Sequence, residues 1–400
     1  MVMLAAKRLE HLARRIGRRL PLGPGLKING HLTSEVGLGE AARNMARAAH
    51  AAGLPLSYRN LRLANRDNEP EFAELRWRRV PRKAALTVLG LMSFPDFVRA
   101  MDDRPFNLAY PAWELSRLPE APRRALERFD EVWAMSRFVL DALEREVSAP
   151  ARWMPQALPL PPRMPAPRRG RESLRLLTFF DVDSSVVRKN PQAAVEAFAA
   201  AFTPERRDVE LVVKLRGGAR DEAVRAWLRQ AATRDPRITV VDETLSRAAL
   251  DALMADCDVF LSLHRSEGFG FGAAEALAAG KAVVSTDYGG TADFVTPETG
   301  YPVAWSPRPL APGDYAHTEG QSWADPSVEA AAEALKAIYD SPDEARRRCE
   351  AGFALLRREH SFEAVGARMT ARLSELGALR RPAADPEDAG PGDPREASRR

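Results

Sequence analysis

The chain has 400 residues, of which 45% are hydrophobic, so it can build the cores of two or three globular domains. Nowhere does it approach the roughly 20 consecutive apolar residues of a membrane-spanning helix, and residues 1–20 lack the apolar centre of a secretory signal. Two cysteines and six dispersed histidines exclude a disulfide framework, and we therefore expect a cytoplasmic protein without a histidine-built metal site.

The net charge of +4 is concentrated at the amino terminus. Residues 1–20 carry six basic side chains against one acidic, a net +5, so the remaining 380 residues sum to −1. A nearly neutral body argues against nucleic acid as a partner. We expect a basic amphipathic helix over residues 1–22. It either packs on the protein or makes a peripheral contact with an anionic membrane, and the sequence leaves both alternatives open.

Short apolar segments alternate with helical sequence through the first half of the chain. A glycine-rich turn with Gly37 and Gly39 follows the first strand, and a helix is expected over residues 41–52. Such alternation predicts a parallel, doubly wound sheet, so we assign residues 23–160 to a Rossmann-like domain. The expected strands are residues 26–30, 54–58, 84–92, 106–112 and 131–134.

Six prolines between residues 155 and 171 interrupt this pattern, and we place an interdomain linker at residues 161–171. The alternation then restarts in a second Rossmann-like domain, residues 172–358, so we expect an α/β chain of two domains that face each other across a cleft. Residues 359–380 should form a helix that packs back on the first domain, and residues 381–400 should be disordered. Strands are expected at 174–180, 209–215, 238–241, 259–263 and 282–286, with helices at 191–202 and 221–232.

The segment 264–281 carries the clearest chemical signal. It joins a buried strand to a helix, expected from Ala273 to Ala279, through three alternating glycines. Such a unit presents backbone N–H groups and a helix N-terminus at the carboxyl edge of a sheet, where a phosphate or diphosphate binds well. Glu267 lies on the loop and Glu275 is expected in the first turn of the helix. Both carboxylates can accept hydrogen bonds from sugar or ribose hydroxyl groups.

Glu267 and Glu275 match the E-x7-E motif of the family-4 retaining glycosyltransferases, which have the GT-B fold. The segment 274–295 looks like that family's helix–Gly–strand–Gly-Gly segment. The sequences LSLHRSEGFGFG, WAMSRF (133–138) and RKNP (188–191) are similar to the branch that includes bacterial mannosyl- and rhamnosyltransferases. The resemblance covers about residues 26–375.

This resemblance implies roles for the matching residues. Glu275 would hold the donor ribose, Glu267 would contact the transferred sugar, and Arg188 with Lys189 would neutralise the leaving diphosphate. The family's basic pair is spaced more widely, so Lys214 or Arg216 is a further candidate. The donor-binding residues implied in this way are Gly37, Gly39, Lys214, Gly268, Phe269, Gly270, Phe271, Glu275 and Gly290.

The acceptor side is less explicit in the sequence. Many members carry a catalytic histidine in the first domain within a His-Pro or His-Asp context, and this chain has no such pattern. His31, on the first loop, and Glu114 are the alternatives, and each has a purely structural interpretation as well. The resemblance implies a nucleotide-sugar donor, GDP-mannose ahead of UDP- and dTDP-sugars, a glycan or lipid-linked acceptor, and no cofactor or essential metal.

Two other functions are compatible with the same fold. A nucleotide-sugar epimerase would need several acid–base residues lining both domains, and we find none. A non-catalytic binding or scaffold protein would have lost donor-contacting residues, whereas Glu267, Glu275, Lys189 and the glycines are all present. A dehydrogenase is disfavoured because neither glycine-rich turn has the G-x-G-x-x-G spacing with a later acidic residue.

Overall fold

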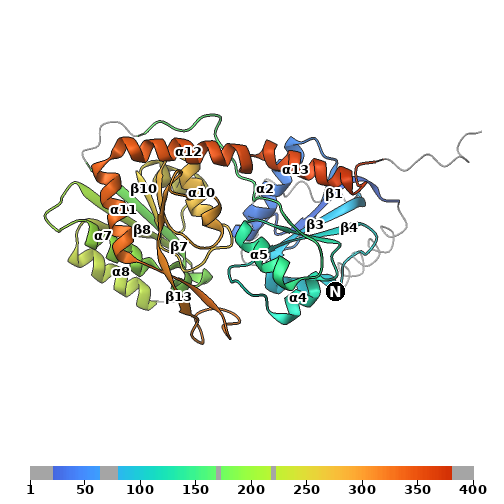
Figure 1. Cartoon of the computed structure of the whole chain (residues 1–400), viewed down its shortest axis with the longest axis horizontal. Coiled ribbons are helices and arrows are strands. Elements are labelled where there is room, and N and C mark those ends of the chain that lie inside the picture. The colour runs from blue at the N-terminus through green and yellow to red at the C-terminus, as the bar shows by residue number, and fades with distance from the viewer. Residues whose placement is uncertain (1–20, 64–79, 168–172, 218–221, 381–400) are drawn as a thin grey trace, which may run out of the picture.

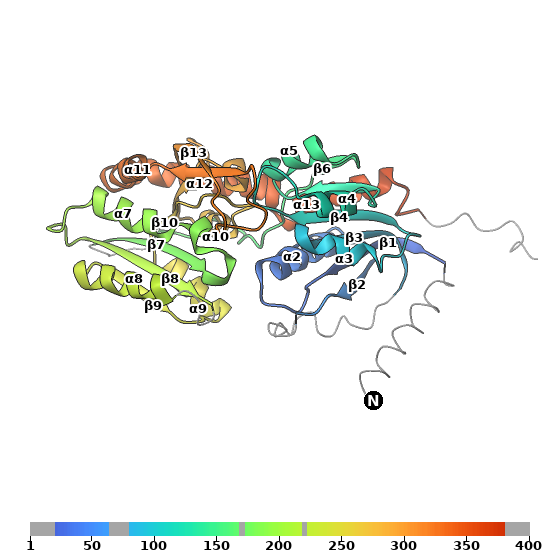
Figure 2. The same cartoon turned by 90° about the horizontal axis from the view of Figure 1, so that it is seen from below.

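The computed structural model describes residues 21–63, 80–167, 173–217 and 222–380. The segments for which a basic helix (1–22) and a disordered tail (381–400) were expected therefore lie almost wholly outside the described residues. Two parallel sheets lie side by side along the longest axis, each surrounded by helices (Figures 1 and 2). Within the described ranges, no helix is long and apolar enough to cross a membrane.

The first sheet has six parallel strands in the order β2-β1-β3-β4-β5-β6. Parallel strands are covered on both faces and therefore read as continuous apolar runs, and β3 is buried from Ala84 to Leu89. Its strands are β1 (Gly23–Gly30), β2 (Leu56–Asn60), β3 (Arg82–Gly90), β4 (Phe106–Ala112), β5 (Glu131–Ala134) and β6 (Ala151–Trp153). Its helices are α2 (Gly37–Ala51), α3 (Phe94–Val98), α4 (Glu120–Leu126) and α5 (Arg137–Glu146).

The second sheet is also parallel, in the order β12-β11-β10-β7-β8-β9. Its strand order reverses between β7 and β10, and ligands of doubly wound sheets bind beyond the carboxyl ends of strands at such a switch point. The strands are β7 (Leu174–Asp181), β8 (Val209–Arg216), β9 (Ile238–Asp242), β10 (Val259–Ser262), β11 (Ala282–Thr286) and β12 (Tyr301–Val303). The helices are α6 (Val186–Lys189), α7 (Pro191–Ala201), α8 (Glu222–Arg234), α9 (Arg247–Ala255), α10 (Phe271–Ala278) and α11 (Val328–Asp340).

Two consecutive helices connect the domains (Figure 1). Helix α12 (Pro342–His360) packs on α10, and α13 (Phe362–Glu375) packs on α2 in the first domain. The break between them lies at Ser361, which caps α13, and the N–H of Leu158 donates to the carbonyl of His360 at 2.8 Å. The beginning of the proline-rich stretch is therefore buried against this break and does not run free, since Gln156, Ala157 and Leu158 are all buried.

The cores of the two domains are joined on one side. Apolar side chains of α10, including Ala274 and Leu277, belong to the same buried cluster as the first-domain core. The other face of the second sheet has its own cluster, centred on Leu176, Leu211 and Leu261. A continuous apolar core of this kind holds the glycine-rich loop before α10 against the first domain.

Several details differ from the sequence expectations. Helix α2 begins at Gly37, so Gly37 and Gly39 lie in its first turn and not in an open turn before it. Helix α10 begins at Phe271 because Gly270 takes a left-handed conformation as its N-cap, and Glu275 therefore lies beyond the first turn. An antiparallel hairpin of β13 (Trp305–Pro309) and β14 (Ser322–Pro326) was not expected at all.

Candidate active site

The loops that follow β7 and β10 meet at the switch point of the second sheet. His264 anchors the second of these loops: its side chain is fully buried, with Nδ1 3.0 Å from the Ser262 hydroxyl and Nε2 3.1 Å from the carbonyl of Tyr288. Burial lowers the pKa of this imidazole, so His264 is neutral near pH 7 and acts as a structural support for the loop.

The glycines of the loop allow close approach of backbone to backbone. A Cβ atom on Gly268 would lie 2.5 Å from the carbonyl oxygen of Trp113 in the first domain, so only glycine fits there. Gly270 has φ +91° and begins α10 in a conformation that other residues rarely adopt. Gly290 donates its N–H to the carbonyl of Glu267 at 2.7 Å and packs on Gly268.

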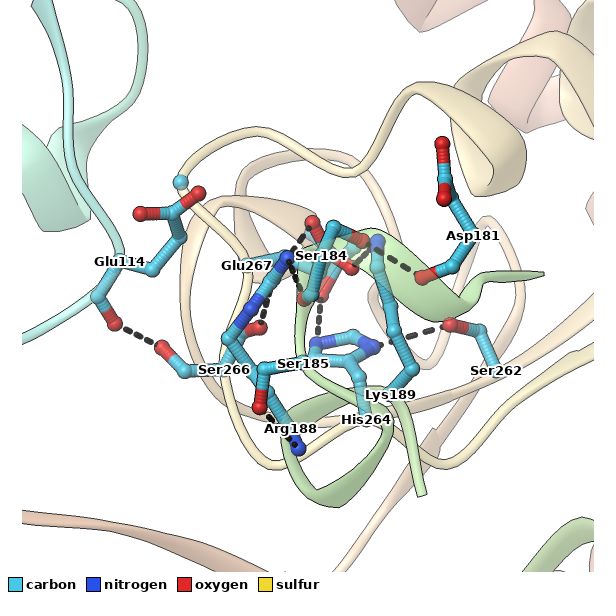
Figure 3. Close-up of polar contacts among 12 residues, drawn as sticks. Glu114, Asp181, Ser184, Ser185, Arg188, Lys189, Ser262, His264, Ser266 and Glu267 are labelled. Atoms are coloured by element: carbon cyan, nitrogen blue, oxygen red, sulfur yellow. Dashed lines mark hydrogen bonds and ion pairs between the residues drawn. The ribbon is translucent and has the colours of Figure 1, made fainter. Parts of the chain in front are cut away.

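Glu267 lies between two cations from the other loop, as Figure 3 shows. Lys189 Nζ donates a hydrogen bond to Oε1, and the Arg188 guanidinium lies 3.3 Å from Oε2. Burial would raise the pKa of the Glu267 carboxyl, but the charges of Lys189 and Arg188 lower it to about 2. The three side chains carry a net charge of +1, which suits an anionic ligand.

Hydrogen bonds to backbone carbonyls hold Arg188 in addition to its ion pair. Arg188 is almost completely buried and donates to the carbonyls of Ser266, at 2.8 Å, and Ser184, at 3.1 Å. Burial would lower the pKa of its guanidinium, but the carboxylates of Glu267 and Glu114 raise it, so Arg188 stays charged.

The turn that carries the two cations is strained. Ser185 has φ 67°, a left-handed conformation that is uncommon for serine, while its side chain caps α6 by accepting from the N–H of Arg188. Asn190 is also left-handed and donates to the carbonyl of Leu263 at 3.0 Å, and Pro191 then starts α7. These bonds fix Arg188 and Lys189 against the loop after β10.

The first domain closes the site from the other side. The Ser266 hydroxyl donates to the carbonyl of Glu114, which lies just after β4 (Figure 3). The Glu114 carboxylate accepts a 2.6 Å hydrogen bond from Tyr315, a residue of the unexpected hairpin. Glu114 thus lies at the domain junction next to the loop that carries Glu267.

A second set of contacts joins the domains at the N-terminus of α5. The hydroxyl of Ser136 donates to the carbonyl of Gly268 at 2.6 Å, and the N–H of Arg137 donates to Oδ2 of Asp293 at 2.8 Å. Burial raises the pKa of Asp293 to about 6, and the hydrogen bond from Arg137 opposes this only in part. The WAMSRF segment therefore packs directly on the glycine-rich loop.

This junction predicts a pH-dependent stability. Because the pKa of Asp293 is raised above its unfolded value, its protonation stabilises the folded state at low pH, and this contribution is lost as the pH rises through about 6. Asparagine at position 293 does not titrate. The melting temperature of the wild type minus that of Asp293→Asn should therefore become larger as the pH is lowered from about 7 to about 5. A constant or decreasing difference in thermal melts would contradict this assignment.

The remaining donor candidates surround the same loops. Glu275 accepts from Arg247 at 2.8 Å through Oε1, and no described residue donates to Oε2. Burial raises the pKa of this carboxyl, and Arg247 opposes the shift. Lys214 is buried with no hydrogen-bond or ion-pair partner among the described residues, and burial lowers its pKa. Arg216 pairs with Asp181 at 3.0 Å and lies 3.7 Å from Glu35 of the first domain.

Other predicted residues are not brought to these contacts. His31 bonds through Nδ1 to the carbonyl of Leu61 in its own domain. Gly39 packs under the His31–Ser34 loop, where a Cβ atom would lie 2.1 Å from the Ser34 carbonyl oxygen, so only glycine fits there. A Cβ atom added to Gly37 would meet no other atom within 4 Å. Of the two acceptor-side alternatives, Glu114 is the one that contacts the second domain.

Sequence reasoning missed Tyr315 and Ser136 as functional candidates. WAMSRF was noticed as a motif, and the position of Ser136 before an amphipathic helix was a signal for an N-cap. Nothing local marks Tyr315, whose partner Glu114 is 201 residues away. Among the described residues, no three His, Cys, Asp or Glu side chains are grouped so that they could hold a metal ion.

Comparison with known proteins shows the fold of the chain. Residues 183–312 match the family described as Glycosyl transferases group 1, and no curated protein matches the sequence. This stretch begins at the turn with Arg188 and includes the whole glycine-rich loop.

Solved structures are similar over most of the chain at low identity. HepE from Anabaena in complex with UDP-glucose is 12% identical with a TM-score of 0.63 over 88% of this chain and 99% of its own. Sucrose-phosphate synthase from Thermosynechococcus elongatus is 16% identical with a TM-score of 0.63 over 89% and 99%. A TarM variant from S. aureus is 13% identical with a TM-score of 0.54 over 72% of this chain, which spans only 54% of TarM. These similarities show the GT-B fold.

Proposed function

We propose that this chain, a glycosyltransferase of the GT-B fold, moves a hexose from a nucleoside-diphosphate sugar to a glycan or lipid-linked acceptor with retention of anomeric configuration. The observation that carries the proposal is the cluster of Glu267, Lys189 and Arg188 at the switch point of the second sheet. A net positive charge beside a glycine-rich loop and a helix N-terminus is a site for a diphosphate.

The proposed reaction uses the charged side chains of the site. As the bond from the anomeric carbon to the diphosphate breaks, the bonding electrons leave with the diphosphate, and the sugar becomes electron-deficient. Arg188 and Lys189 stabilise the charge on the leaving group, while the Glu267 carboxylate contacts the sugar. Retention in one displacement requires the acceptor hydroxyl to approach on the face that the diphosphate leaves. The departing phosphate oxygen is then the nearest base for its proton.

The ribose is assigned to Glu275. Its Oε1 is used by Arg247, and its Oε2 is left to accept from a ribose hydroxyl. Glu275→Ala should abolish nucleotide-sugar binding, because both the ribose contact and the partner of Arg247 are lost. Glu222→Ala is the matched control, since Glu222 also pairs with a helical arginine, Arg229, and lies outside the site. Unchanged donor binding by Glu275→Ala in a thermal-shift titration would rule out the ribose assignment.

We propose GDP-mannose as the donor, because the resemblance is to the branch with mannosyltransferases. HepE binds UDP-glucose, so UDP-sugars belong in the same test. A ligand that binds only the folded state raises the melting temperature, by about 3 °C or more at a hundredfold excess over Kd. A panel of GDP-, UDP- and dTDP-sugars should yield one clear shift. No shift with any of them would contradict the proposed function, and binding without transfer would favour a non-catalytic binding protein.

The acceptor class rests on the amino-terminal segment as well as on the resemblance. Residues 1–20, with their net charge of +5, would bring the enzyme to an anionic membrane, where lipid-linked acceptors are found.

A further inference from the structure

A strap from the second domain reaches over the candidate site. We define the strap as residues 305–326, that is β13, β14 and the residues between them. The two strands pair from Trp305 with Pro326 to Pro309 with Ser322, so their connecting residues project as one unit. Gln321 at the end of this connection donates through Nε2 to the carbonyl of Arg117 in the first domain at 3.0 Å. The donor chemistry proposed above uses no residue of the strap.

One residue of the strap touches both sides of the site. The Tyr315 hydroxyl donates to Oε2 of Glu114 at 2.6 Å, and its ring centroid lies 6.1 Å from that of Trp113. The guanidinium carbon of Arg188 lies 5.9 Å from the same ring centroid. Tyr315 is half-buried and contacts both the first-domain carboxylate and the second-domain cation.

The neighbouring residue of the strap holds the turn with the two cations. The Ser185 hydroxyl donates to the carbonyl of Asp314 at 3.0 Å and accepts from the N–H of Arg188. Two consecutive strap residues thus support the strained turn and fix the Glu114 carboxylate.

The strap and the first domain also border an open space. A hollow with a volume of about 600 Å³ lies between residues 117–119 of the first domain and residues 317–321 of the strap. Its lining includes the polar side chains of Arg117, Glu319 and Gln321. Its walls belong to segments that follow Glu114 and Tyr315 by two or three residues along the chain, and their polar side chains suit a saccharide.

We propose that Tyr315 is a positioning residue that holds the Glu114 carboxylate on the acceptor side of the site and away from Arg188. Glu114 already acts on Arg188 by its charge. Without the tyrosine hydroxyl, the carboxylate is free to turn toward the guanidinium and to compete with the departing diphosphate for it. This inference rests on the proposed function and adds the element that orients the acceptor.

The test is Tyr315→Phe, which keeps the ring and removes only the hydroxyl. Transfer, measured as kcat/KM for the acceptor, should fall about ten- to hundredfold, as expected for the loss of a hydrogen bond to a charged group. Donor affinity in a thermal-shift titration should stay within about twofold, and the melting temperature should change little because the packing is kept. Tyr339→Phe is the matched control, since Tyr339 also donates to a carboxylate, that of Asp208, outside the site.

A double-mutant cycle separates positioning from a merely structural role. If Tyr315 acts through Glu114, Tyr315→Phe should cause no further loss of transfer in a Glu114→Gln background. Additive losses would overturn the proposal, and so would a Tyr315→Phe enzyme that transfers like Tyr339→Phe. Loss of donor affinity equal to the loss of transfer would also overturn it, because Tyr315 would then act on the donor turn. Failure of the proposed function is distinct, since the wild type would then bind no nucleotide sugar.

Discussion

Replacing Arg188 by methionine should reduce glycosyl transfer by about a thousandfold, the loss expected when a fixed cation aimed at a leaving group is removed. Methionine keeps the length of the side chain but loses the charge and the hydrogen bonds to the carbonyls of Ser266 and Ser184. Lys189 alone then faces the Glu267 carboxylate. Breaking a buried ion pair should also lower the free energy of unfolding, by about 3 kcal/mol.

The matched control separates the two effects of this substitution. Arg237 is as buried as Arg188 and pairs with Asp235, but it lies just before β9, at the opposite edge of the sheet. Arg237→Met should lose comparable stability and retain transfer. Steady-state transfer rates and thermal melts of both variants separate the loss of activity from the loss of stability. Equal activity of Arg188→Met and Arg237→Met would remove Arg188 from the catalytic machinery.

Gly268→Ala should reduce transfer by about a hundredfold or more and weaken donor binding much less. A Cβ atom at this position would lie 2.5 Å from the Trp113 carbonyl oxygen, so the first domain must move away from the glycine-rich loop. The proposed donor contacts of Glu267, Glu275, Arg188 and Lys189 lie in the second domain, whereas transfer needs both domains in register. A displacement of about 1 Å between reacting groups costs about a hundredfold in rate.

Gly23→Ala is the control for this prediction, because a Cβ atom there would meet nothing closer than 3.6 Å. Rates of transfer and thermal-shift titrations with the donor should separate the two variants. A Gly268→Ala enzyme that transfers as fast as Gly23→Ala would show that the contact between the loop and Trp113 is not needed for the reaction.

The sheets and the donor loop were predictable because their signals are local. Parallel strands read as apolar runs, and β4, β5 and β11 have the expected boundaries. The strand–glycine–helix unit around Gly268 and Gly270 is equally local, since its glycines mark close backbone approach and a left-handed N-cap. The strands β6 and β12 were missed because each has only three residues, too few to show any periodicity.

The strap was not predictable from propensity. Pro307, Pro309 and Pro326 lie in its strands and Gly313 and Gly320 in its connection, a composition typical of a loop. Its strands form because they pair with each other and because the connection docks on the first domain through Gln321. The side chains that it brings together are distant in sequence, so no spacing in the chain encodes them.

The acceptor-side residue could not be predicted from local sequence either. The sequence offered His31 and Glu114 without a way to choose, because the choice depends on where the second domain docks. The contacts of Ser266 and Tyr315 with Glu114 make it the residue at the junction, and they come from parts of the chain 152 and 201 residues away.

Transfer from a nucleotide sugar bound at Glu267, Lys189 and Arg188 is tested most directly by its product. We predict that wild-type protein, incubated with the donor that stabilises it and a saccharide acceptor, releases the nucleoside diphosphate. The anomeric proton signal of the new glycoside in NMR should show the donor's own configuration. A product of inverted configuration would contradict the retaining mechanism, and donor binding without release of the diphosphate would contradict catalysis at this site.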